Sequence, residues 1–121
     1  MTTILIVEDE LDAAEMLRVL LELEGYAANV SPNGAHALAR IHEIRPALVI
    51  CDVMMPIMDG PTFIRALREL PEYRATPVIV MSAVHEALLP AGGSHNAFVP
   101  KPMGLKVLLE TVRRLLPASP A

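Results

Sequence analysis

The sequence predicts an α/β fold in which helices cover both faces of a five-stranded parallel sheet. Five short apolar runs alternate along the chain with longer segments in which apolar residues recur at helical spacing. The runs are apolar at consecutive positions, which is typical of strands that are buried on both faces. With 121 residues, the chain is long enough to form one domain with a substantial core.

The first strand and the first helix follow from this pattern. A strand is expected at residues 4–7, and a helix is expected at about residues 12–24. The apolar stripe of that helix consists of Ala14, Leu17 and Leu21. Gly25 is placed to end the helix, because glycine adopts the left-handed conformation of a helix C-terminus without strain.

Two further pairs of a strand and a helix follow. A weaker strand is expected at residues 26–30, and Asn33 is a candidate cap for a helix at about residues 34–43. The apolar side of that helix consists of Ala35, Leu38 and either Ile41 or His42. The next strand is expected at residues 47–51 and the next helix near residues 60–70. The inward residues of this helix are Phe63, Ile64 and Leu67.

The last third of the chain contains two strands and a final helix. The strands are expected at residues 78–81 and 97–99. The final helix has a clear helical period formed by Leu105, Leu108, Leu109, Val112 and Leu116. Between the two strands, a proline and two glycines predict a short or irregular fourth helix. Right-handed crossovers favour a flavodoxin-like, doubly wound sheet with the strand order 2-1-3-4-5.

The overall composition excludes several classes of protein. Hydrophobic residues make up 53% and charged residues 20% of the chain, so disorder is not expected. A net charge of -4 argues against a general affinity for nucleic acid or anionic membranes, which both favour basic surfaces. No apolar stretch approaches the roughly 20 residues of a membrane helix. Because Cys51 is the single cysteine and no signal peptide is recognisable, we expect a cytoplasmic protein. Residues 1–121 are expected to form a single domain with a flexible tail at 117–121.

Acidic residues follow two of the predicted strands. Glu8 and Asp9 come directly after the first strand, and Asp52 follows the third. The carboxyl ends of parallel strands meet at one edge of the sheet, where ligands bind in open α/β folds. Carboxylates that meet there repel one another, and Mg2+, which prefers oxygen ligands, relieves this repulsion. Ser82 and Lys101 follow the fourth and fifth strands, so the edge has the groups needed for phosphoryl transfer onto an aspartate.

Four segments of the chain together resemble the response-regulator receiver domain, the phosphorylated half of a two-component signalling pair. They occur in the expected order and at the ends of predicted strands. The segments are residues 4–10, 52–60, 82–83 and 98–102. The resemblance covers essentially all residues from about 3 to 116.

The resemblance implies a role for each residue of the predicted site. Asp52 matches the phosphoacceptor, and Glu8 and Asp9 match the acidic pair that binds Mg2+. The backbone carbonyl of Met54 falls at the position of the third protein ligand to the metal.

The resemblance also implies a switch. Ser82 matches the hydroxyl that bonds the phosphoryl group, and Lys101 matches the lysine that pairs with another phosphoryl oxygen. Phe98 falls where the family has an aromatic residue that turns inward on activation. The bond between Lys101 and Pro102 would be cis in such a domain.

Each of these residues also has a structural interpretation. Asp52 could cap the loop that follows it, and Glu8 or Asp9 could cap the first helix, a role for which Asp12 competes. Lys101 could be an ordinary surface lysine. Ser82 gains weight only from the other residues, and Phe98 could be a core residue.

Two features depart from the family pattern. The stretch from Ser82 to Lys101 is several residues shorter than usual, so signal output is expected on another face or through an order–disorder change of this stretch. The positions two residues after Asp52 and Ser82 are the apolar Met54 and Val84. Neither can position a water molecule on the phosphoryl group, and slow self-dephosphorylation is predicted.

The function implied by the resemblance is a signalling switch that is not an enzyme beyond its own phosphorylation and slow dephosphorylation. A phosphohistidine on a histidine kinase or phosphotransfer protein would dock near the first helix and transfer its phosphoryl group to Asp52. Output would occur by contact with a downstream protein, since the sequence contains no basic recognition helix or DNA-binding domain. One alternative is a degenerate receiver that acts as an interaction module independent of phosphorylation. A second is a phosphatase resembling haloacid dehalogenases, which would need an acid where this chain has Met54.

Overall fold

The computed structural model describes residues 1–83, 95–101 and 105–116. Its five-stranded parallel sheet has the order β2-β1-β3-β4-β5, which confirms the predicted topology. The strands are β1 (Thr3–Val7), β2 (Ala27–Ser31), β3 (Leu48–Asp52), β4 (Val78–Ser82) and β5 (Ala97–Pro100). The described helices are α1 (Leu11–Leu23), α2 (Gly34–Ile44), α3 (Gly60–Glu69), the short 3-10 helix η1 (Pro71–Tyr73) and α4 (Leu105–Leu115).

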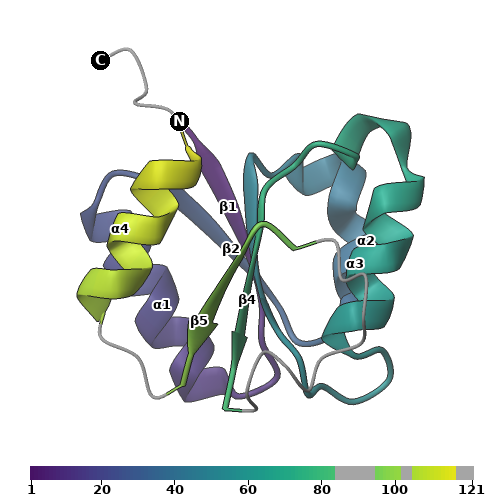
Figure 1. The fold of residues 1–121 in the computed structure, drawn as a ribbon, viewed down its shortest axis with the longest axis horizontal. Coiled ribbons are helices and arrows are strands. Elements are labelled where there is room, and N and C mark those ends of the chain that lie inside the picture. Colours follow the sequence, from purple (N-terminus) through teal and green to yellow (C-terminus); the bar gives the residue numbers. More distant parts are fainter. Residues whose placement is uncertain (84–94, 102–104, 117–121) are drawn as a thin grey trace.

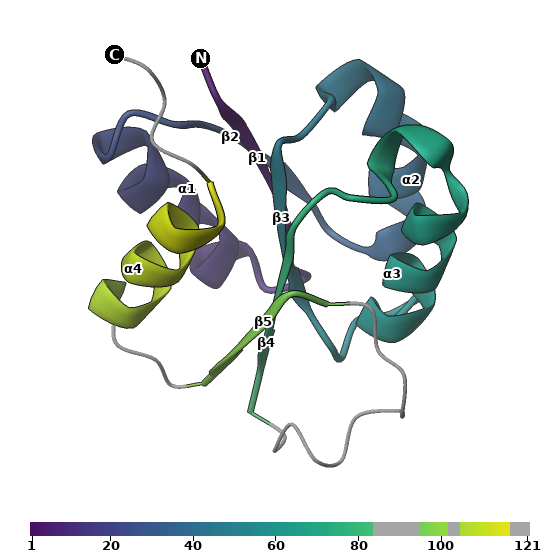
Figure 2. The ribbon, with the colours of Figure 1, turned by 45° about the horizontal axis from the view of Figure 1, so that its top comes forward.

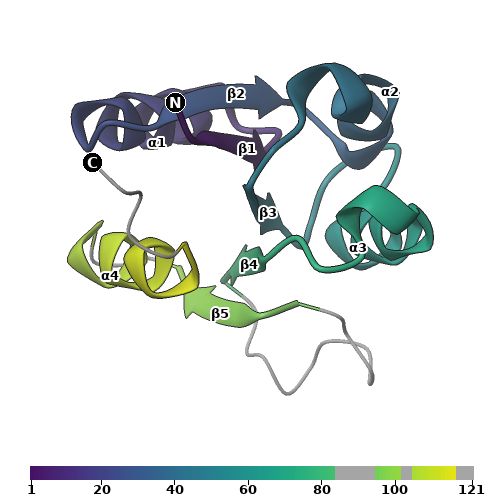
Figure 3. The same ribbon diagram turned by 90° about the horizontal axis from the view of Figure 1, so that it is seen from above.

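The helices form a layer on each face of the sheet. Figure 1 shows α1 and α4 on one side of the strands and α2 and α3 on the other. The view from above in Figure 3 shows the same three layers. None of the helices in the described part of the chain is long and apolar enough to cross a membrane.

One hydrophobic cluster fills the space between the sheet and each layer of helices. The strands contribute alternate residues to the two clusters. In β1, Leu5 and Val7 face the cluster under α2 and α3, whereas Ile4 and Ile6 face the cluster under α1 and α4. Both faces of the central strands are therefore buried, which explains their uninterrupted apolar sequence. Cys51 belongs to the first cluster, and burial raises the pKa of its thiol well above the ordinary value.

The ends of α1 and α2 confirm two predictions about their caps. Gly25 has a φ of 94°, and its N–H donates to the carbonyl of Glu22, while the N–H of Tyr26 donates to that of Leu21. These are the two hydrogen bonds of a Schellman motif. At the start of α2, the Asn33 side chain accepts a hydrogen bond from the His36 N–H at 2.9 Å.

Some expectations about the helices were wrong. In α2, Ile41 is buried and Leu38 packs against the core as expected, but the other buried positions are Gly34 and Ala37 rather than Ala35, and His42 is exposed. In α4, Leu105 is exposed and the burial begins at Leu108. The predicted residues of α1 and α3 are buried as expected.

Three predictions fall outside the described residues. These are the irregular fourth helix, the tail at 117–121 and the cis bond between Lys101 and Pro102. They stay predictions.

Candidate functional site

The carboxyl ends of the strands bring three acidic side chains together. Glu8 follows β1, and its amide donates to the Ser31 carbonyl at the end of β2, while Asp52 is the last residue of β3. One carboxylate oxygen from each of Glu8, Asp9 and Asp52 lies within 4.8 Å of the other two. Glu8 is only 1% exposed and Asp52 only 9%, whereas Asp9 is open to solvent. The sequence therefore identified all three members of this acidic cluster.

Lys101 supplies a positive charge to the cluster from the end of β5. Its Nζ donates to Glu8 Oε1 at 2.8 Å and to Asp52 Oδ2 at 3.1 Å. Its backbone N–H donates to the Ser82 carbonyl at 2.8 Å, which holds the two strand ends together. Because 25% of its side chain is exposed and both acids contact it, Lys101 is not an ordinary surface lysine.

Burial and charge shift the pKa values of Glu8 and Lys101. Burial raises the pKa of the Glu8 carboxyl above its usual value; the hydrogen bond from Lys101 lowers it again in part, and the Asp52 charge adds to the rise. For Lys101, burial alone would lower the pKa, but hydrogen bonds and charges from Glu8 and Asp52 outweigh it and raise the pKa. The cluster thus contains three carboxylates, of which Glu8 and Asp52 pair with the Lys101 ammonium, and the excess negative charge suits a hard divalent cation.

The loop that follows Asp52 also contacts the Asp52 carboxylate. The Val53 N–H donates to Asp52 Oδ1 at 2.7 Å, so each carboxylate oxygen of Asp52 has a defined partner. The Gly60 N–H, at the start of α3, donates to the Val53 carbonyl at 2.9 Å. A Cβ on Gly60 would collide with the Asp52 carbonyl oxygen. Gly60 was predicted only as the start of a helix and not as part of the site, although a glycine directly after the helix cap Asp59 was a usable signal.

The remaining predicted residues lie around the same edge. Ser82 is the last residue of β4 and is 1% exposed. Phe98, on β5, is half-buried against the cluster under α2 and α3. The Met54 side chain is 69% exposed. The metal role of the Met54 carbonyl and the switch roles of Ser82 and Phe98 stay predictions.

The loop after Asp52 contains a strained residue that the sequence did not reveal. Ile57 has a φ of 70° and is 85% exposed. The Met58 N–H donates to the Pro56 carbonyl at 2.7 Å, so Ile57 is the central residue of a γ-turn. A β-branched side chain is unfavourable at positive φ, and such strain occurs mostly at functional sites.

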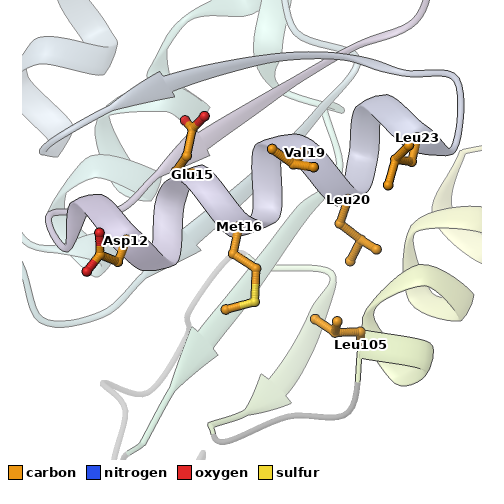
Figure 4. Close-up of a pocket in the computed structure, with 7 residues that line it drawn as sticks. All are labelled: Asp12, Glu15, Met16, Val19, Leu20, Leu23 and Leu105. Carbon is orange, nitrogen blue, oxygen red and sulfur yellow. The ribbon is translucent and has the colours of Figure 1, made fainter.

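An apolar groove lies between α1 and the start of α4, and Figure 4 shows the residues that line it. Met16 and Leu20 extend from α1 toward Leu105 in this view. The groove has a volume of about 400 Å³, and Asp12 and Glu15 add acidic groups to it. An adjoining pocket of about 460 Å³ shares Met16 and Leu105 with the groove and includes Lys101. The groove therefore leads toward the acidic cluster.

Comparisons with known proteins agree with this arrangement. The family model of the response regulator receiver domain matches residues 4–113. Response regulator MprA of Mycobacterium sp. (strain KMS) is 35% identical over 116 residues, covering 93% of this chain and 50% of MprA. This chain thus spans about half the length of that relative.

Solved structures show the same likeness. The receiver domain of a signal transduction histidine kinase from Syntrophus aciditrophicus has a TM-score of 0.90 and 36% identity, covering 96% of this chain and 90% of that one. The response regulator TrrA from Thermotoga maritima, solved in complex with Mg2+ and BeF, has a TM-score of 0.85 and 29% identity. That match covers 96% of this chain and 100% of TrrA.

Proposed function

The chain belongs to the response regulator receiver domain family, and from this membership we propose that it is a phosphorylatable switch of two-component signalling in the cytoplasm. In this proposal Asp52 accepts a phosphoryl group from a phosphohistidine on a histidine kinase or phosphotransfer protein. The observation that supports it most is the position of Asp52, which contacts Lys101 and lies within the cluster of Glu8, Asp9 and Asp52.

Asp52 is the nucleophile of the proposed transfer. Its hydrogen bonds from Val53 and Lys101 fix the orientation of the carboxylate at the sheet edge. A carboxylate oxygen forms the new bond to phosphorus while the bond from phosphorus to the donor's imidazole nitrogen breaks. The imidazole leaves with the electron pair, and the product is an aspartyl phosphate.

The acidic cluster fits Mg2+ as the cofactor of this step. Its oxygens lie close together and carry more negative charge than Lys101 can balance. Glu8, Asp9 and Asp52 would hold the ion, with the Met54 carbonyl as a further ligand. When bound, Mg2+ supplies charge neutralisation for the phosphoryl oxygens.

Lys101 and Ser82 convert phosphorylation into a conformational signal in this proposal. The Lys101 ammonium, which pairs with Glu8 and Asp52 in the structure, would pair with a phosphoryl oxygen, and the Ser82 hydroxyl would donate to another. Phe98 lies on β5, the strand that Lys101 follows, and would turn further inward. These contacts shift a pre-existing equilibrium only as far as they favour the active state.

The groove between α1 and α4 is the proposed docking site of the phosphohistidine partner. It is apolar at Met16, Leu20 and Leu105, and an amphipathic helix of a partner binds such a groove through its apolar face. Its continuation toward Lys101 would bring a histidine on that helix close to Asp52.

Two other functions have less support. An interaction module independent of phosphorylation would not need the buried contacts between Lys101 and two acids, which are costly to form without a charged ligand. A phosphatase of the haloacid dehalogenase type would need a second acid at Met54, whose thioether cannot donate a proton.

Intact mass after incubation with acetyl phosphate tests the proposal. We expect one added phosphoryl group on the wild type with Mg2+, and none with EDTA or in Asp52→Asn. Glu43→Gln, an exposed charge change on α2, is the control and should gain the group normally. No gain in the wild type, from acetyl phosphate or from a phosphohistidine donor, would contradict the proposal.

A further inference from the structure

The strand that directly precedes Lys101 is short and is an edge strand of the sheet. β5 has four residues, and within the described part of the chain it pairs only with β4, from Ile79 opposite Ala97 to Ser82 opposite Pro100. Pro100 has no N–H to donate to the ladder. The pairing itself therefore supplies few hydrogen bonds to set the register of β5, although that register decides where the Lys101 side chain points.

Asn96, the residue before β5, adds two hydrogen bonds to the start of this pairing. Its backbone N–H donates to the Val78 carbonyl at 2.8 Å, and its side-chain Oδ1 accepts from the Val78 N–H at 2.9 Å. The side-chain carbonyl thus takes the place of a backbone acceptor. The backbone N–H and C=O of Val78 are both hydrogen-bonded to Asn96.

Arg68, near the end of α3, fixes the Asn96 side chain in turn. Its Nη2 donates to Asn96 Oδ1 at 3.0 Å. Its Nη1 donates to the carbonyls of Tyr73 at 3.0 Å and Thr76 at 2.6 Å, in the connection from α3 to β4. Figure 2 shows the start of β5 reaching toward the side of the sheet where α3 lies.

These contacts connect the two ends of the candidate site through α3 and β5. α3 begins at Gly60, which packs against the Asp52 backbone, and bears Arg68 one residue before its end. β5 begins beside Asn96 and delivers Lys101 back to Asp52. Asp52 and Lys101 are thus held by α3 and β5, and these two elements meet at the other end of the strands, where β4 and β5 begin.

We propose that Asn96, held by Arg68, is a positioning residue that sets the register of β5 and thereby places the Lys101 ammonium between Glu8 and Asp52. A register shift of one residue would turn Lys101 to the other face of the sheet. The catalytic part of this inference rests on the proposed function, because it concerns the lysine that serves phosphoryl transfer to Asp52.

A double-mutant cycle of Asn96→Ala and Lys101→Ala tests whether Asn96 acts through Lys101. The measurement is the rate of Asp52 phosphorylation by acetyl phosphate with Mg2+. We expect Asn96→Ala to lower this rate by about tenfold or more in the wild-type background, since small misplacements of catalytic groups are costly. In the Lys101→Ala background we expect no further loss. Equal losses in both backgrounds would overturn the proposal.

Two variants separate positioning from general damage. Asn96→Asp keeps an acceptor oxygen for Val78 and Arg68 and should retain a rate close to that of the wild type. Asn29→Ala, on the opposite edge strand β2, is the matched control and should leave the rate unchanged. A loss in Asn96→Asp as large as that in Asn96→Ala would contradict the role of the side-chain oxygen.

Amide hydrogen exchange tests the register without any phosphoryl donor. The Lys101 N–H, which bonds the Ser82 carbonyl, should exchange about tenfold faster in Asn96→Ala and at the wild-type rate in Asn96→Asp. Unchanged exchange in Asn96→Ala would overturn the proposal whatever the rates of phosphorylation. A wild type that accepts no phosphoryl group would instead contradict the proposed function, and exchange would still decide the register.

Discussion

Glu8 and Asp52 are carboxylates that the fold removes almost completely from water. Burial of an ionised carboxylate costs free energy unless charged or hydrogen-bonding partners compensate. Lys101 compensates in part, because it contacts both, but the exposed Asp9 brings a third negative charge to the same place. The raised pKa of Glu8, an acid buried beside charged groups, is typical of functional sites rather than of packing.

We predict that Met54 lengthens the lifetime of the proposed aspartyl phosphate. Its apolar side chain is exposed two residues after Asp52 and offers no group to position an attacking water. We predict that Met54→Asn shortens the phosphoryl lifetime by about tenfold, because an amide can orient that water. The decay of the phosphorylated mass measures it.

The matched control for this change is Val107→Asn, which introduces an amide on the exposed surface of α4. Its lifetime should equal that of the wild type. An equal or longer lifetime in Met54→Asn would show that water positioning does not limit dephosphorylation here.

Ile57 stores strain beside the phosphoacceptor. Its φ of 70° disfavours any side chain, and a β-branched one most of all. We predict that Ile57→Gly raises the free energy of unfolding by about 1 kcal/mol, the strain relieved less the entropy that glycine adds to the unfolded chain. Urea denaturation measures it.

Ile57→Ala serves as the comparison, since it removes the β-branch but keeps a Cβ at positive φ. It should recover less stability than glycine. A loss of stability in Ile57→Gly would mean that the exposed isoleucine contributes packing that outweighs its strain.

At the scale of elements, the start of α3 connects local structure to the site. The Asp59 carboxylate accepts a hydrogen bond from the Thr62 N–H at 2.9 Å and caps the helix whose next residue, Gly60, contacts Asp52. Hydrogen bonds from the Thr62 side chain and backbone lower the pKa of Asp59 below its usual value. The ionised cap is therefore the stabilising form.

We predict that Asp59→Ala lowers the free energy of unfolding by about 1 kcal/mol near pH 7. Because the folded pKa is below the unfolded value of 3.8, the contribution of Asp59 is present above pH 3.8 and is lost as the pH falls through the folded pKa. Asp59→Asn keeps a capping oxygen without the titration. Urea denaturation of both variants against pH tests this, and a constant difference between wild type and Asp59→Asn down to pH 2 would contradict it.

The helices and strands differ in how well the sequence predicted them. Continuous apolar runs predicted β1, β3 and β4 to within one residue, because burial on both faces leaves little alternative. The expected inward side of α2 was right at Ile41 and Leu38 but wrong at Ala35, since the stripes that begin at Gly34 and at Ala35 both have helical spacing. η1 has three residues and therefore no period to detect.

The residues of the site could be predicted where they follow parallel strands, because the ends of such strands lie close together. Lys101 and Glu8 are 93 residues apart, yet parallel strands bring their carboxyl ends to one edge. Arg68 and Asn96 are 28 residues apart, and their contact lies where β4 and β5 begin. It depends on how far the long Arg68 side chain extends. An arginine and an asparagine at these positions do not indicate such a contact in the sequence. The strain at Ile57 could not be predicted from the sequence either.

At the scale of the whole molecule, the acidic cluster links metal binding to stability. Any ion that binds the folded state alone stabilises it by mass action, which gives about 1.4 kcal/mol at ten times Kd. We predict that Mg2+ raises the unfolding free energy of the wild type by this amount and that Asp9→Asn loses most of the gain. Thermal unfolding with Mg2+ or EDTA measures it, with Glu43→Gln as the unaffected control. An equal gain in Asp9→Asn would place the ion elsewhere.

The measurement that tests the central claim most directly is the identification of the phosphorylated residue. Reduction of the phosphorylated protein with borohydride converts an aspartyl phosphate to homoserine, and peptide mass spectrometry locates the change. We predict that the modification occurs at Asp52 alone, only in samples that contained Mg2+, and is absent from Asp52→Asn. A modification at Asp9, at another carboxylate or at no residue would contradict the assignment of Asp52 as the phosphoacceptor.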